Sequence, residues 1–123
     1  MILVDTSVWI EHLRHGDNTL VNLLNTGQVL THPYTIGELA LGNLRQRDLI
    51  LDTLHNLPRA RIATDEEVMA FINRHKLYGI GIGYIDAHLL TSVRLTPNTQ
   101  LWTQDKRLRA AAVQLGLHAA LKH

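Results

Sequence analysis

Residues 1–10 of the chain read MILVDTSVWI, and this opening stretch decides the class of fold. A short apolar run ends at Asp5, two hydroxyl residues follow, and Trp9 and Leu13 then recur with the i, i+4 spacing of a helix. A buried strand that leads into a capped helix is the building unit of α/β proteins. Asp5 has two interpretations here: it accepts free N–H groups at the helix start, or it belongs to a chemical site.

The alternation of strand and helix continues along the chain. Thr64 and Glu67 predict a capping box, and Asn18 predicts the cap of a short helix that ends at Gly27. Strands separated by helices pair in parallel, so we expect a three-layer α/β sandwich in one domain over residues 1–123. The expected strands cover 1–4, 28–31, 60–63, 99–103 and 117–121, and the expected helices cover 7–14, 18–26, 33–44, 47–56, 64–77, 84–94 and a segment after Asp105.

Composition narrows the class of protein. The 123 residues are 46% hydrophobic, enough to fill one core. The formal net charge of +1 gives no general attraction to nucleic acid. The absence of cysteine excludes disulfides and thiolate metal sites. The sequence contains no apolar run long enough to span a membrane, and its start lacks the pattern of a secretory leader, so we expect a cytoplasmic protein.

Four acidic residues stand where functional groups gather in a parallel sheet. Asp5 and Asp105 follow the ends of two expected strands, and the carboxyl ends of such strands line one crevice. Glu38 and Asp86 lie within apolar helical stretches, where acids are rarely buried unless they are paired or bind a metal. The alternative for Asp5 and Asp105 is helix capping, and for Glu38 and Asp86 it is a place at the edge of an apolar face.

Carboxylates gathered at one sheet edge favour a divalent cation, because like charges repel and a cation removes the conflict. Ligation by oxygen alone selects Mg²⁺ or Mn²⁺ rather than zinc. Such an ion polarises a phosphate and lowers the pKa of bound water, which is the chemistry of phosphodiester hydrolysis.

The sequence resembles the PIN-domain ribonucleases, and among them the VapC-type toxins of toxin–antitoxin pairs. The resemblance covers nearly the whole chain and rests on VDTSVWI, YTIGELALG, IGYIDAHLLTSV and LWTQDKRL in this order and spacing. It implies a parallel sheet of about five strands flanked by helices. Asp5, Glu38, Asp86 and Asp105 fall at the family's acidic positions, the last with the least certain direct contact to metal. Thr103 falls at a hydroxyl position beside the last acid, and Thr6 or Ser7 is placed to orient Asp5.

The resemblance also implies an activity and partners. We expect an endoribonuclease dependent on Mg²⁺ or Mn²⁺ that cuts single-stranded or loop RNA, where unstacked bases are easier to reach. A small VapB-type antitoxin that wraps the toxin, and a homodimer, are implied as well.

Three other functions stay open at this point. An aspartyl-nucleophile phosphatase also places Asp after its first strand, but it needs a second Asp at the position of Ser7. A non-catalytic module would bind metal or RNA without cutting. An RNA-processing nuclease of the same family would have no antitoxin.

Two local features have simpler interpretations than a phosphate-binding site. The stretch GIGIG at 79–83 matches neither phosphate-binding glycine motif, and its glycines favour a close approach to the helix of Asp86. Arg107 and Arg109 follow Asp105, and they either contact RNA phosphate or form a solvated helix start.

Overall fold

A three-stranded parallel sheet forms the centre of the protein in the computed structural model, which describes residues 1–121. The strand order is β2-β1-β3, with Leu3 of β1 opposite Leu30 of β2 and Leu101 of β3. The strands are β1 (Ile2–Val4), β2 (Val29–Leu30) and β3 (Gln100–Trp102). The helices within this range are α1 (Thr6–His15), α2 (Asn18–Asn25), α3 (Pro33–Ala40), α4 (Arg47–His55), α5 (Asp65–His75), α6 (Tyr84–Leu95) and α7 (Lys106–Gln114).

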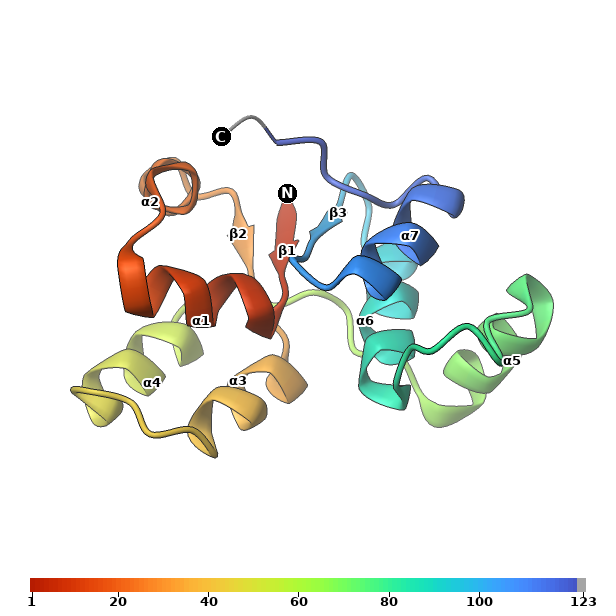
Figure 1. Cartoon of the computed structure of the whole chain (residues 1–123), viewed down its shortest axis with the longest axis horizontal. Coiled ribbons are helices and arrows are strands. Elements are labelled where there is room, and N and C mark those ends of the chain that lie inside the picture. The colour runs from red at the N-terminus through yellow and green to blue at the C-terminus, as the bar shows by residue number, and fades with distance from the viewer. Residues whose placement is uncertain (122–123) are drawn as a thin grey trace.

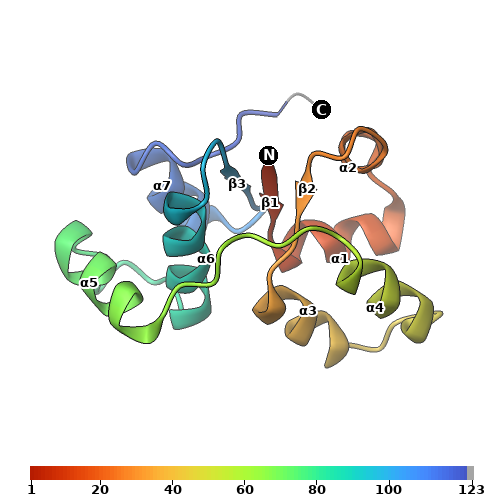
Figure 2. The ribbon, with the colours of Figure 1, turned by 180° about the vertical axis from the view of Figure 1, so that it is seen from behind.

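The expected count of about five strands is wrong for the described part of the chain. Each of the two missing edge strands is reduced to a single bridge, one joining Thr31 to Arg59 and the other joining Leu101 to His118. Figure 2 shows the connection from α4 to α5 crossing the strands on the side that faces the viewer. The N–H of Thr31 donates to the carbonyl of Pro58 (2.9 Å), and the N–H of Ala60 donates back to Thr31 (3.0 Å).

Local chemistry explains why neither bridge grows into a strand. Pro58 has no N–H with which to continue the ladder. On the other edge, the N–H of Leu101 donates to the carbonyl of Leu117 (2.7 Å), and the N–H of Ala119 donates to that of Leu101 (2.9 Å). β3 ends one residue later at Trp102, so the pairing has no partner strand beyond that point.

The central strand alternates its side chains between two hydrophobic clusters, as a pleated strand must. Leu3 packs with α5, α6 and α7, whereas Ile2 and Val4 pack with the helices from α1 to α4. Figure 1 shows these two groups of helices on opposite sides of the strands. Both faces of the sheet are therefore covered, which confirms the layered α/β arrangement and explains why β1 is apolar at every position.

The helix starts agree with the sequence patterns, with one exception. Thr64 and Glu67 form the predicted capping box, with hydrogen bonds of 3.1 and 2.9 Å. The cap of α2 is Asp17 rather than Asn18, since its Oδ1 accepts the N–H of Leu20 at 2.9 Å. α3 ends at Ala40, before the predicted end at residue 44, in a turn where Gly42 donates to the carbonyl of Leu39.

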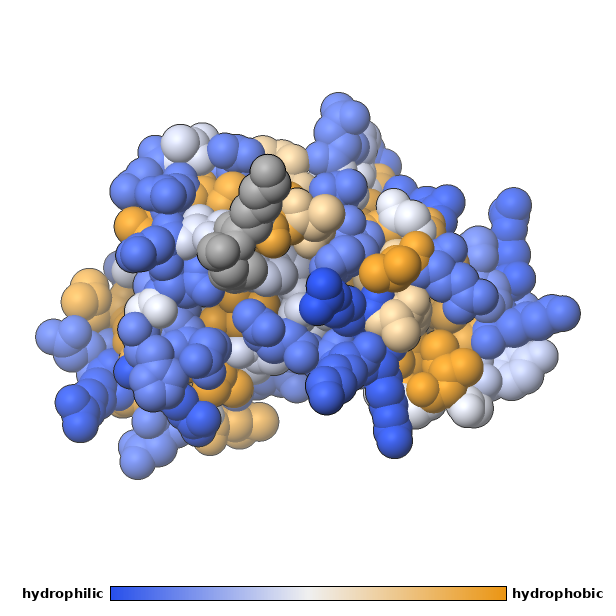
Figure 3. Space-filling model, turned by 45° about the horizontal axis from the view of Figure 1, so that its top comes forward, coloured by the Kyte–Doolittle hydropathy of each residue, from blue (hydrophilic) through white to orange (hydrophobic). Residues whose placement is uncertain are grey.

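The surface and the helix lengths give two further observations. On the face shown in Figure 3, hydrophobic side chains form separate small patches between hydrophilic ones. Among residues 1–121, no helix has both the length and the apolar character required to cross a membrane.

Candidate active site

Asp5 occupies the N-cap position of α1, but its side chain does not cap the helix. Its Oδ2 instead accepts hydrogen bonds from the hydroxyls of Ser7 and Thr103, both at 2.8 Å. Asp5 is only 6% exposed. A buried carboxylate held by two hydroxyl donors has a fixed orientation, which favours the chemical interpretation of Asp5 over capping.

The two hydroxyls that hold Asp5 are themselves fixed by the backbone. The N–H of Gln104 donates to the Ser7 Oγ (3.0 Å), and the N–H of Asp105 donates to the Thr103 Oγ1 (3.0 Å). The start of α1 and the end of β3 are thereby joined around one carboxylate oxygen. Ser7 stands where an aspartyl-nucleophile phosphatase needs its second Asp, and here it is a hydrogen-bond donor to Asp5.

Glu38 lies on α3 and connects to the start of α1. The hydroxyl of Thr6 donates to its Oε1 at 2.8 Å. Of the two hydroxyl residues expected to orient Asp5, Ser7 therefore does so, while Thr6 orients Glu38. Glu38 is exposed, so its carboxylate remains accessible to a ligand.

Asp86 lies in the first turn of α6 and is half-buried. Burial raises the pKa of this carboxyl above its ordinary value of 3.8, and the negative charges of Asp5, Asp105 and Glu38 raise it further. The N–H of Gly83, which donates to its Oδ2 at 3.0 Å, acts in the opposite direction. The other three sequence-predicted acids are therefore near enough to Asp86 to influence its charge.

Asp105 is a true N-cap, so the capping interpretation holds for this residue. Its Oδ1 accepts the N–H groups of Arg107 (3.0 Å) and Leu108 (2.9 Å) at the start of α7. The residue is exposed, and Oδ2 takes no part in these two bonds. Capping therefore fixes one oxygen of Asp105 and leaves the other outside these two bonds.

The donor set fits a hard divalent cation by its chemistry. All four side chains offer carboxylate oxygens, which Mg²⁺ and Mn²⁺ prefer. Burial is the main cause of the raised pKa of Asp86, and the repulsion from the other three acids, which adds to it, is one that a cation would relieve. Between residues 1 and 121, however, no three Asp, Glu or His side chains lie close enough together to hold a metal ion in the arrangement that the structure shows. The four carboxylates thus form an open acidic cluster rather than a finished coordination sphere.

Comparison with known proteins identifies the family. A family model of the PIN domain matches residues 2–114. The chain belongs to the PIN-domain family. This PIN domain is 51% identical over 120 residues to the protein named Ribonuclease VapC32 in Mycobacterium tuberculosis strain CDC 1551 / Oshkosh, covering 98% of this chain and 97% of the relative. The same values hold for Ribonuclease VapC32 of strain ATCC 25618 / H37Rv. The predicted membership of the family and its VapC-type branch are confirmed.

A solved structure has the same fold as this PIN domain. It is titled "Structure of FitAB bound to IR36 DNA fragment" and superposes with a TM-score of 0.58 at 23% sequence identity. The superposition covers 92% of this chain and 91% of that one. The likeness supports the α/β architecture described above.

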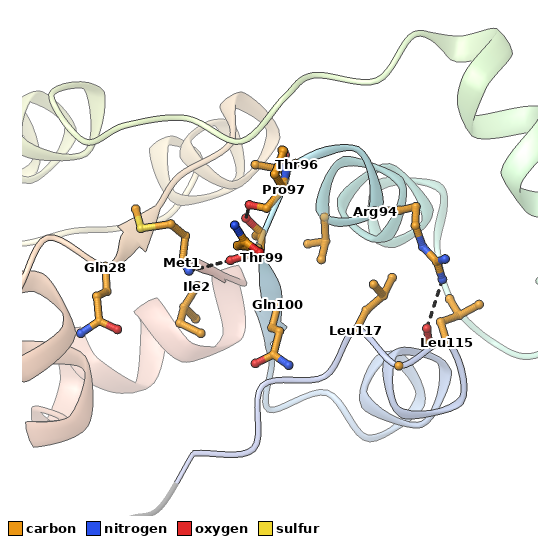
Figure 4. A pocket seen from close by; sticks show the side chains of 13 residues that line it. Met1, Ile2, Gln28, Arg94, Thr96, Pro97, Thr99, Gln100, Leu115 and Leu117 are labelled. Atoms are coloured by element: carbon orange, nitrogen blue, oxygen red, sulfur yellow. Dashed lines mark hydrogen bonds between the residues drawn. The ribbon is translucent and has the colours of Figure 1, made fainter.

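Two cavities of the PIN domain differ in their relation to the acidic cluster. The pocket in Figure 4, of about 660 Å³, lies at the amino ends of the strands, beside Met1 and Gln100. None of the four acids lines it. A groove of about 710 Å³ along α1, α3 and the start of α4 includes Glu38, with Ile10 and Leu13 among its apolar lining. Only the second cavity therefore adjoins the acidic cluster.

One contact near the acidic cluster has no counterpart among the sequence motifs. The side chain of Arg107 lies against Gly81, in the loop before α6. The GIGIG stretch predicted close packing at this loop, but the residue that packs there, Arg107 on α7, is distant in the sequence. A sequence pattern can indicate that a glycine allows close packing, but it does not identify the side chain that packs there.

Proposed function

We propose that this PIN domain is a metal-dependent endoribonuclease that acts as the toxin of a toxin–antitoxin pair. The observation that carries the proposal is the state of Asp5, buried and held by Ser7 and Thr103 instead of capping α1. The electrostatic coupling of Asp86 to Asp5, Glu38 and Asp105 supports a shared acidic site. The 51% identity to proteins named ribonuclease supports RNA as the substrate.

In this proposal Asp5, Glu38 and Asp86 hold Mg²⁺ or Mn²⁺, and Asp105 assists from the start of α7. The bound cation would stabilise negative charge on the scissile phosphate and acidify the attacking water. Ser7 and Thr103 hold the Asp5 carboxylate in one orientation. Thr6 does the same for Glu38. The hydroxyl groups therefore restrict the orientation of two of the four carboxylates before a cation binds.

The partner in this proposal is a small VapB-type antitoxin. The groove along α1, α3 and α4 offers an apolar floor that includes Ile10 and Leu13, and it ends at Glu38 of the acidic cluster. A protein segment seated there would reach the carboxylates and block them. The proposal also includes a homodimer. Its location would be the cytoplasm, where the toxin would meet its RNA substrate and the antitoxin.

The test is cleavage of cellular RNA. Purified protein is incubated with total RNA and Mn²⁺, and new RNA ends are mapped by sequencing. Parallel samples contain either chelator or the Asp86→Asn protein. We expect one or a few discrete cuts that disappear in both controls. Wild-type protein free of antitoxin that makes no cuts above the controls would overturn the proposed activity.

A further inference from the structure

Gly81 is in direct contact with the side chain of Arg107. A methyl group on Gly81 would lie 2.6 Å from Nη1 of Arg107, 2.7 Å from its Cδ and 3.1 Å from its Cζ. The first two distances are shorter than real side-chain contacts, so the arginine occupies the space that a side chain on residue 81 would need. Gly81 also has a φ of +83°, which favours glycine. The absence of a side chain on Gly81 therefore makes room for Arg107, and a larger residue would force the arginine side chain to shift. We call this contact the seat of Arg107 on Gly81.

The seat places the guanidinium at the rim of the acidic cluster. Arg107 comes two residues after Asp105, and its own N–H donates to Asp105 Oδ1 at 3.0 Å. Gly81 comes two residues before Gly83, whose N–H donates to Asp86 Oδ2 at 3.0 Å. The Arg107 side chain thus spans the two segments that position two of the four carboxylates.

The guanidinium of Arg107 is available to a ligand. In the part of the chain that the structure describes, the ion pairs join Arg47 to Asp48 and His88 to Asp65, and neither involves Arg107. Arginine presents several N–H donors in a planar fork that matches two oxygens of a phosphate. An exposed guanidinium that packs on Gly81 and takes part in neither ion pair is suited to bind an anion that arrives from solution.

We propose that Arg107, seated on Gly81, binds a backbone phosphate of the RNA next to the phosphate that is cut. The inference rests on the proposed function, because RNA brings a row of phosphates to the acidic cluster. Four carboxylates repel such a chain, and a net charge of +1 supplies no general attraction. A local cation at the rim compensates this repulsion and fixes the register of the strand.

The test measures kcat/KM over a series of salt concentrations, with Mn²⁺ and a short single-stranded RNA that carries a cut site mapped in total RNA. The variants are Arg107→Ala, Arg107→Lys, Gly81→Ala and Gly79→Ala. Gly79 is the matched control, because its φ of +72° imposes the same backbone strain but nothing lies within 4 Å of its added methyl group. Thermal unfolding of each variant checks that the protein is folded, so that the kcat/KM values of folded proteins are compared.

Arg107→Ala is expected to lower kcat/KM at low salt on the order of fivefold, as for one exposed charge pair. It is also expected to reduce the slope of log kcat/KM against log salt by about 0.7, the value for one phosphate contact on a single strand. Gly81→Ala should reproduce both effects by displacing the guanidinium, and Gly79→Ala should not. Arg107→Lys should restore the salt slope more than the rate, because it keeps the charge and loses the fork.

The outcomes separate this inference from the activity itself. Wild-type protein that cuts no RNA overturns the proposed function and this inference with it. If the wild type cuts RNA, an unchanged salt slope in Arg107→Ala overturns the phosphate contact, even where kcat/KM falls, because a merely structural role lowers the rate without changing the slope. Equal behaviour of Gly81→Ala and Gly79→Ala would contradict the role of the seat.

Discussion

Asp5 and Asp105 both occupy the N-cap position of a helix, but their side chains make different hydrogen bonds. Each stands at the N-cap of a helix that follows a strand, yet only Asp105 accepts the N–H groups of its helix. Asp5 turns instead to Ser7 and to Thr103, a residue distant in the sequence. The sequence predicted both acids at the sheet edge. It did not predict which one caps, because that depends on the hydroxyl of Thr103, just after the end of β3.

The hydroxyl of Ser7 gives a prediction at the scale of one residue. Ser7→Ala removes one of two donors to the Asp5 carboxylate, so we expect RNA cleavage to slow about tenfold, as for one hydrogen bond to a charged group. The kcat of the variant measures this effect. Ser7→Thr, which keeps a hydroxyl at the same place, is the control. A Ser7→Ala protein with wild-type kcat would show that the bond does not orient Asp5.

The raised pKa of Asp86 predicts how stability depends on pH. Ionised Asp86 is disfavoured by burial and by three neighbouring acids, so this group lowers stability once the pH has risen through its raised pKa. The penalty fades as the pH falls toward the ordinary value of 3.8. In chelator, Asp86→Asn should therefore unfold at a Tm no lower than wild type at neutral pH, while losing RNA cleavage.

Measuring Tm for both proteins from neutral to acidic pH checks this expectation. The difference in Tm should shrink as the pH falls through the raised pKa. A variant that is less stable than wild type at neutral pH and equal at acidic pH would contradict the direction assigned to Asp86.

At the scale of elements, periodic and capped helices were predictable, and the sheet edges were not. The pattern of Val68 and Phe71 and the capping box of Thr64 placed α5 correctly. Residues 60–63 and 117–121 are apolar enough to suggest strands, but each edge makes a single bridge. The length of an edge strand depends on the neighbour available to pair, and Pro58 and the early end of β3 limit that pairing.

The capping box of α5 gives a prediction for an element remote from the chemistry. Thr64→Ala removes the acceptor of the Glu67 N–H, so we expect a loss of about 1 kcal/mol in the free energy of unfolding. Denaturant unfolding measures the loss. Thr53→Ala is the matched control, because that hydroxyl bonds a carbonyl within α4 and caps nothing. RNA cleavage per folded molecule should be unchanged in both variants; a large loss of activity in Thr64→Ala would tie α5 to the site.

At the scale of the whole molecule, the acidic cluster lies where two halves of the fold meet. Asp5 and Glu38 come with α1 and α3, which pack on one face of the sheet, and Asp86 and Asp105 come with α6 and α7 on the other. Parallel strands bring their carboxyl ends to one edge, which is why the sequence predicted this meeting. The seat of Arg107 on Gly81 escaped prediction, because a loop conformation rather than a periodic pattern creates it.

The most direct test of the account is RNA cleavage by an Asp5→Asn protein in the presence of Mn²⁺. Asparagine keeps the size of the side chain and an oxygen acceptor for Ser7 and Thr103, while it removes the negative charge. We predict a variant that folds, as judged by cooperative thermal unfolding, and makes none of the discrete cuts of the wild type. A folded Asp5→Asn protein with full activity would contradict the assignment of Asp5 and, with it, the acidic cluster as the site of catalysis.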